Sequence, residues 1–361
     1  MSGRNAMRII AEDKTIRYIE LDCLRGVAAL LVVLFHFTMG KSQAELGFKL
    51  GTTGVDLFFI ISGFVISMSI EKVSSGMQFV INRASRLYPT YLASVTITFI
   101  VISIYTFYKQ GLIIVSDYFG NLTMFQYYLN IPNLDEPYWT MIVEMLFYIF
   151  ILILFYARLL KYVVIIGASI TSFVLFISWF YWDKFIWLFN ALPILEFFPL
   201  FFAGILFYKI IKEKSNPLYS YLVVIGCLIT QVLLFDHAGR SKEFISQSEY
   251  AMMLILYFGF FILFVNGKLK IIVSKPLLFL GKISFALYLT HQYIFVGHVL
   301  PFLLNRLNLN FWFSIICIGL PLSLGLATAI TYYIEIPYSK KMKHWLSVRF
   351  LGRTKTTLLR F

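Results

Sequence analysis

The first candidates for chemistry are an arginine and a histidine in one apolar stretch, Arg25 and His36. Eleven residues separate them, which on a helix is about 20° beyond three full turns, so the two side chains would share one face about 16 Å apart. A charge inside the hydrocarbon of a membrane is costly unless it is paired or faces water, which makes such residues candidates for function. The alternative is an arginine that snorkels to the interface and a histidine bonded to a neighbouring carbonyl.

Two acidic residues stand in similarly apolar surroundings, Asp56 in the segment 54–64 and Glu144 in the segment 139–148. An acid within reach of a histidine fixes the tautomer of the ring and raises its basicity. Either acid could therefore orient His36 as a general base. Asp56 could instead be a helix N-terminal acid favoured by the helix dipole. Gly63, in the same segment as Asp56, is expected to let two helices pack closely.

Two arginines, Arg83 and Arg86, are spaced to share a face if their segment is helical. Paired guanidinium groups match the oxygens of a phosphorylated ligand, although simple anchoring at the membrane surface would also use them.

A third group, Ser284, Tyr288 and His291, follows helical spacing and forms one stripe. This stripe could serve a reaction or could make hydrogen bonds between helices.

The elements that position these residues follow from composition. The chain has 361 residues, 60% apolar and 14% charged, with a mean hydropathy of +0.80. Soluble domains have about 45–50% apolar and about 25% charged residues, so a soluble fold is excluded. The apolar stretches are continuous rather than alternating, which indicates helices instead of a barrel. We predict an all-α integral membrane protein with about ten transmembrane helices, at 22–40, 55–71, 90–108, 139–157, 162–181, 192–211, 218–235, 250–266, 277–297 and 312–334.

The basic residues predict the orientation of these helices. With the N-terminus in the cytoplasm, 24 of the 31 Lys and Arg residues fall on the inner side, so both termini are predicted to be cytoplasmic. This distribution explains the positive charge without a nucleic-acid partner. We expect a cytoplasmic N-terminal segment at 1–21, one membrane domain at 22–337 and a basic cytoplasmic tail at 338–361.

The predicted topology separates the ionisable residues into two sets. The outer half of the membrane receives His36, Asp56, Glu144 and His291, and the inner half receives Arg25, Arg83, Arg86 and Lys282. This layout suggests an anionic ligand held from the cytoplasm, with acid–base chemistry nearer the outer face.

The three cysteines lack metal-ligand spacing, and we expect no metal cofactor.

Several of these segments together resemble the signature of the acyltransferase family 3 membrane enzymes, which O-acylate bacterial surface sugars. The resemblance begins with the Arg25–x10–His36 spacing and extends over about residues 16–340. It continues through Gly-Val-Asp-x-Phe-Phe-x-x-Ser-Gly-Phe at 54–64, Arg-x-x-Arg-Leu-Tyr-Pro at 83–89, Trp-x-x-x-x-Glu-x-x-Phe-Tyr at 139–148, Leu-Gly-Lys-Ile-Ser through His at 280–291 and Glu-Ile-Pro at 335–337.

The resemblance implies ten helices in the bacterial inner membrane, cytoplasmic acyl-CoA as donor and a carbohydrate or lipid-linked sugar as acceptor, reached from the outer side. Acetyl-CoA is the expected donor on family grounds alone. The resemblance carries over His36 and Arg25 as the residues most needed for activity, and Arg83 and Arg86 as contacts of the CoA phosphates. It makes Asp56, Glu144 and His291 site residues with open roles.

The expected reaction has His36 as general base, oriented by Asp56 or Glu144, while the pantetheine arm of CoA passes Arg25. Tyr288 or His291 could donate a hydrogen bond to the developing oxyanion. An acyl-His36 intermediate is an alternative to direct transfer.

A proton-coupled secondary transporter is the alternative function, because buried ionisable residues in many spans also suit a carrier, although the chain shows no internal repeat.

Overall fold

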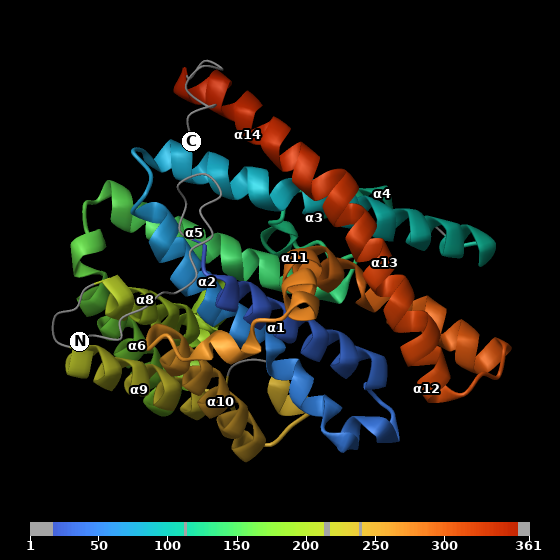
Figure 1. Cartoon of the computed structure of the whole chain (residues 1–361), viewed down its shortest axis with the longest axis horizontal. Helices are drawn as coiled ribbons and strands as arrows, with labels where there is room; N and C mark the ends of the chain where they lie inside the picture. Colours follow the sequence, from blue (N-terminus) through green and yellow to red (C-terminus); the bar gives the residue numbers. More distant parts are fainter. Residues whose placement is uncertain (1–16, 112–113, 213–216, 238–239, 353–361) are drawn as a thin grey trace. The chain divides into compact units, whose positions relative to one another are not determined.

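The computed structural model of the chain describes residues 17–111, 114–212, 217–237 and 240–352. All regular elements within these ranges are helical, as Figure 1 shows, so the all-α prediction is confirmed. Most of the expected segment 1–21 and the last nine residues of the tail 338–361 lie outside the described residues.

Seven helical segments are long and apolar enough to cross a membrane, and a bent pair makes an eighth if it counts as one span. The protein is therefore a multi-pass membrane protein. The seven are α1 (Ile19–Thr38), η2 with α2 (Phe48–Ile70), α3 (Gly76–Tyr108), η4 with α5 (Glu136–Tyr156), η5 with α6 (Leu160–Phe180), α10 (Gln247–Val265), and the run Phe311–Leu351 that contains α12 (Phe311–Phe313), α13 (Leu320–Ile330) and α14 (Ile336–Leu351).

The remaining helices are shorter. The bent pair is α11 (Lys275–Thr290) followed by the segment Gln292–Arg306. Two apolar helices, α8 (Phe198–Lys212) and α9 (Pro217–Leu233), stand where the sixth and seventh spans were expected, at 192–211 and 218–235, and both are shorter than a typical span, so the count of ten stays a prediction. Two further helices lie between these, α4 (Val115–Asn121) and α7 (Trp182–Ala191).

Three predicted boundaries are wrong. The helix expected at 90–108 begins at Gly76, and the helix expected to end at 334 continues to Leu351. Hydropathy detects only the apolar part of a helix, and both extensions carry basic residues. The span expected at 277–297 is broken after Thr290, where the axis bends by 63°.

The chain divides into two compact units. Within the described residues, unit 1 is drawn from 17–32, 42–76 and 146–281, and unit 2 from 33–41, 77–145 and 282–352. Helices α1, α5 and α11 each contribute residues to both units.

In unit 1, helices α2 and α8 pack closely and run in the same direction. A Cβ at Gly63 would lie 2.0 Å from the carbonyl oxygen of Phe201, so the expected close packing at Gly63 is confirmed. The Phe59 and Phe197 rings are 4.9 Å apart, and twelve residues beyond Phe59 the Glu71 carboxylate pairs with Lys212. The two helices are therefore aligned over almost the full length of α8.

Unit 1 also contains a close approach between α1 and α11. A Cβ at Gly26 would lie 2.6 Å from the Leu277 carbonyl oxygen, and a Cβ at Gly281 would lie 1.9 Å from the Asp22 carbonyl oxygen. Both glycines stand ten residues before a histidine, His36 on α1 and His291 after α11. Because any larger residue would push these helices apart, the glycines set how closely they approach.

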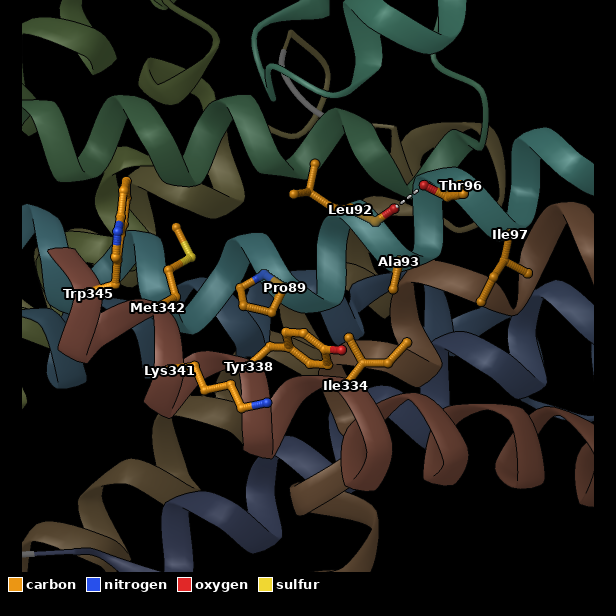
Figure 2. Close-up of a pocket in the computed structure, with 10 residues that line it drawn as sticks. All are labelled: Pro89, Leu92, Ala93, Thr96, Ile97, Ile334, Tyr338, Lys341, Met342 and Trp345. Carbon is orange, nitrogen blue, oxygen red and sulfur yellow. Dashed lines mark hydrogen bonds between the residues drawn. The ribbon is translucent and has the colours of Figure 1, made fainter.

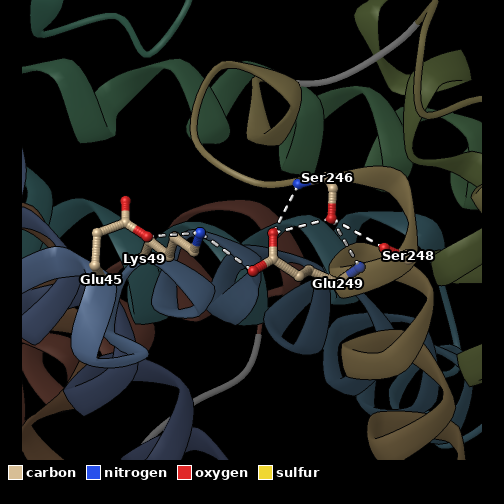
Figure 3. A network of polar contacts seen from close by, with 5 residues as sticks. All are labelled: Glu45, Lys49, Ser246, Ser248 and Glu249. Carbon is tan, nitrogen blue, oxygen red and sulfur yellow. Dashed lines mark hydrogen bonds and ion pairs between the residues drawn. The ribbon is translucent and has the colours of Figure 1, made fainter.

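An ion-pair network joins the segment before α2 to the start of α10, as Figure 3 shows. The Lys49 ammonium lies 2.9 Å from the Glu45 carboxylate and 3.2 Å from the Glu249 carboxylate. Ser246 caps α10, because its hydroxyl accepts from the Glu249 N–H while the Glu249 side chain accepts from the Ser246 N–H. This network fixes one end of α10 within unit 1.

Candidate functional site

Two histidines from distant parts of the sequence meet in unit 2. His36 lies in the last turn of α1, and His291 is the residue at the break after α11. The Nδ1 atom of His36 lies 3.1 Å from the Nε2 atom of His291, and the ring centroids are 4.9 Å apart. His291 is fully buried and His36 is half-buried, so the ring of His291 contacts His36 from the interior side.

The hydrogen bonds assign the tautomers of the two rings. The Nδ1 atom of His291 lies 2.7 Å from the main-chain oxygen of Tyr288, and a carbonyl oxygen can only accept, so this Nδ1 carries a proton. In neutral His291 the Nε2 atom therefore has a lone pair, and the Nδ1–H of His36 donates to it. The lone pair of neutral His36 is left on its Nε2 atom, which gives that atom the character of a base.

The break beside His291 is held by a residue that the sequence analysis did not select, Asp135. Both of its carboxyl oxygens accept from the main-chain N–H of Tyr293, at 3.1 and 3.2 Å. This N–H lies two residues beyond His291, where the helical hydrogen bonding of α11 has ended. The carboxyl group therefore replaces a partner that the broken helix no longer supplies.

Asp135 is 1% exposed, and burial raises the pKa of its carboxyl group to about 8, against the lowering effect of the Tyr293 N–H. The sequence offered one signal for it, an acid directly before the apolar span at 139–157. Its partner is 158 residues away, so spacing alone could not identify the pair.

The other candidates on α11 also lie in the interior. Ser284 and the side chain of Tyr288 are buried, and the rings of Tyr288 and His291 lie 5.9 Å apart. Both ring nitrogens of His291 are engaged, one with His36 and one with the Tyr288 carbonyl. Of the two expected oxyanion donors, the geometry leaves Tyr288 as the candidate.

The two acids expected to orient His36 have different surroundings. Asp56 is buried in unit 1, where it accepts a hydrogen bond of 3.2 Å from the Tyr250 hydroxyl, which in turn accepts from Gln231. Glu144 is half-buried on α5 and belongs to unit 2. The pairing of either acid with His36 stays a prediction.

The arginines occupy two different settings. Arg25 lies in unit 1, 3.5 Å from the Asp22 carboxylate, which also accepts from Arg17 at 2.7 Å. Arg83 and Arg86 both lie on α3, so the helical spacing expected of them is confirmed. Arg86 is exposed and Arg83 is half-buried.

Lys343 of α14 adds a third positive charge beside Arg83. The two groups lie close enough for their like charges to repel, and the guanidinium of Arg83 also lies 5.8 Å from the centre of the Phe79 ring. An anion bound between two such groups would relieve their repulsion, which suits a phosphate. Within the described part of the chain, His, Cys, Asp and Glu side chains form no group of three or more that could hold a metal ion.

Comparison with known proteins gives two relatives. The candidate acetyltransferase ORF330 of Acidianus two-tailed virus is 27% identical over 286 residues, which cover 74% of this chain and 80% of that protein. Protein 2 in the picA locus of Rhizobium radiobacter is 36% identical over 89 residues, 22% of this chain and 44% of that protein. No solved structure matches the chain.

The sequence profile of an acyltransferase domain, that of acyltransferase family 3, matches residues 18–332. This range contains both histidines, Asp135 and the arginine pair on α3. It covers most of the chain and agrees with the motifs that first suggested the resemblance. The chain belongs to acyltransferase family 3.

Proposed function

We propose that this protein transfers an acyl group, most simply acetyl, from cytoplasmic acyl-CoA to a hydroxyl group of a carbohydrate or lipid-linked sugar, in the inner membrane of a bacterial cell. The observation that carries the proposal is the His36–His291 contact. A hydroxyl group needs a base to become a nucleophile, and the hydrogen bonds leave Nε2 of His36 as a nitrogen that can accept a proton.

The proposed reaction needs one proton-accepting group. The acceptor hydroxyl gives its proton to Nε2 of His36 as its oxygen attacks the thioester carbonyl carbon. The C–S bond then breaks, the new C–O bond remains in the ester, and the proton leaves His36 for the CoA sulfur. His291 keeps Nδ1 of His36 protonated throughout, so that Nε2 is the atom that exchanges the proton.

The positive groups on α3 and α14 support acyl-CoA as the donor. CoA carries phosphate groups, and Arg83, Arg86 and Lys343 offer a cluster of cations from two helices. Arginine forks bind phosphate oxygens in pairs, and lysine adds a point charge. We assign these three residues to the nucleotide end of the donor and His36 to its thioester end.

Acetyl-CoA binding and CoA release by the purified full chain in detergent test the proposal. His36→Ala should bind acetyl-CoA normally and lose CoA release by roughly 100-fold or more, because general base catalysis contributes about that much. Arg83→Ala with Arg86→Ala should weaken acetyl-CoA binding by roughly tenfold or more. Arg306→Ala removes an exposed arginine elsewhere in unit 2 and should change neither quantity.

Each outcome separates the two halves of the proposal. If His36→Ala releases CoA at the wild-type rate, His36 is not the base. If no form of the protein binds acetyl-CoA, acyl-CoA is not the donor. Ligand-stimulated proton movement in vesicles without CoA release would favour a transporter instead.

A further inference from the structure

Unit 2 has an apolar groove between α3 and α14 that the proposed reaction does not use. Its cavity volume is about 700 Å³, within the usual range for ligand sites. Figure 2 shows side chains from both helices along it, with Trp345 and Met342 towards one end and Ile97 towards the other. From Pro89 to Ile97 the groove follows α3 for about 12 Å, which is most of the hydrocarbon depth of one leaflet.

One charged side chain, Lys341, lies in the half of the groove that also contains Met342 and Trp345, and most of the other lining side chains are apolar. The Lys341 ammonium lies 5.2 Å from the centre of the Tyr338 ring. Near this end of the two helices are also Lys343 and Arg83, whose charges repel each other. The opposite end is lined by Ile97 and Ile334. The occupant that fits such a groove has an anionic head and a hydrocarbon chain.

The position of the groove indicates a lipid as that occupant. The lining from Leu92 to Ile97 and Ile334 belongs to the apolar parts of two runs that could cross a membrane, whereas Tyr338 to Trp345 belong to the basic extension of the second run. The apolar end of the groove therefore lies at the depth of the hydrocarbon, and its Lys341 side lies towards the membrane surface. Trp345 is 63% exposed and Tyr338 is 52% exposed, and both line the charged part of the groove. Exposed tryptophan and tyrosine are enriched where hydrocarbon gives way to headgroups, which places the lipid headgroup beside Lys341.

We propose that the groove between α3 and α14 binds one anionic glycerophospholipid, with the phosphate at Lys341 and one acyl chain directed along Ala93 towards Ile97 and Ile334. A zwitterionic lipid would bring its own cation towards Lys341, so an anionic headgroup is preferred. The proposal does not depend on the reaction assigned to His36. It does predict that a lipid phosphate lies near the cations assigned to CoA.

Native mass spectrometry of the detergent-purified full chain tests this directly. The protein is incubated with equimolar phosphatidylglycerol and phosphatidylcholine that carry the same acyl chains. The wild type should retain one phosphatidylglycerol in preference to phosphatidylcholine by about fivefold, the effect of one lysine near an anionic lipid. Lys341→Ala should remove the preference. Lys340→Ala, its exposed neighbour outside the groove lining, should keep it.

The apolar half of the groove needs its own variant. Ala93→Trp fills the space beside the smallest side chain of the groove and should lower retention of both lipids at least fivefold. Ile104→Trp places the same side chain at an exposed position farther along α3 and should not. Equal retention of the two lipids by the wild type would overturn the proposal. The proposal would also be overturned if Lys341→Ala and Lys340→Ala had equal effects. It would likewise be overturned if a long-chain acyl-CoA displaced the lipid in a one-to-one exchange.

Discussion

The imidazole of His291 decides which nitrogen of His36 can act as a base. Its own Nδ1 proton is committed to the Tyr288 carbonyl, so its Nε2 atom can only accept while the ring is neutral. A phenyl ring at this position would fill the space without accepting, and the tautomer of His36 would no longer be set. A glutamine could still offer an amide oxygen to Nδ1 of His36.

We therefore expect His291→Phe to lower kcat for acyl transfer by roughly 10- to 100-fold, the usual effect of losing a group that orients a reactive residue. KM for acetyl-CoA should change little, and His291→Gln should recover part of the lost kcat. Steady-state kinetics of CoA release in detergent measure both constants.

His298→Phe is the matched control for this prediction. His298 lies in the same segment after the helix break, where its ring contacts Tyr105 and Tyr293, and a phenyl ring keeps those contacts. This variant should have wild-type kcat. Wild-type kcat in His291→Phe would mean that His36 does not depend on His291.

The break after α11 depends on one buried acid, and this dependence should appear as a pH effect on stability. Burial raises the pKa of Asp135 to about 8, whereas an unfolded aspartate has a pKa of about 3.9. Between these values the folded state binds a proton that the unfolded state lacks, so this group stabilises the fold less as the pH rises from about 4 to about 8. Asp135→Asn stays neutral and keeps an oxygen for the Tyr293 N–H, so its apparent melting temperature should fall less over this range.

Thermal unfolding of the wild type and variants in detergent at several pH values checks this expectation. Asp183→Asn removes an exposed aspartate and should leave the pH dependence of the melting temperature as in the wild type. An Asp135→Asn variant that follows the wild-type curve would show that the buried carboxyl group does not bind the extra proton.

The helices could be predicted from the sequence where apolar residues are continuous, as at α5, α6 and α10, because hydropathy reports burial in lipid or protein directly. The break at His291 could not be predicted from the sequence, because neither glycine nor proline marks it. The carboxyl group that bonds to the backbone there, that of Asp135, comes from a distant connection. The pairing of His36 with His291 was missed for the same reason. Sequence spacing identified both histidines, but their contact spans 255 residues.

The number of membrane crossings follows from how α8 is placed. This helix has 15 residues, fewer than a typical span of about 20. It nevertheless runs parallel to α2, from Phe197 beside Phe59 to Lys212 beside Glu71. Because α2 belongs to a segment that is long and apolar enough to cross a membrane, a helix aligned with it over this length is expected to cross the same hydrocarbon. We therefore expect α8 to cross from the same side as α2, and α9 to return.

Single cysteines introduced into a chain with Cys23, Cys227 and Cys317 changed to serine test this topology. Lys72→Cys follows α2, Leu218→Cys lies at the start of α9, and Glu243→Cys precedes α10. If α8 crosses, a membrane-impermeant maleimide added outside intact cells labels Glu243→Cys and leaves the other two unlabelled until the cells are opened. If neither α8 nor α9 crosses, Leu218→Cys is labelled together with Glu243→Cys. The first result supports an even number of crossings with both termini in the cytoplasm, because α8 and α9 then add a pair to the eight that include the bent helix.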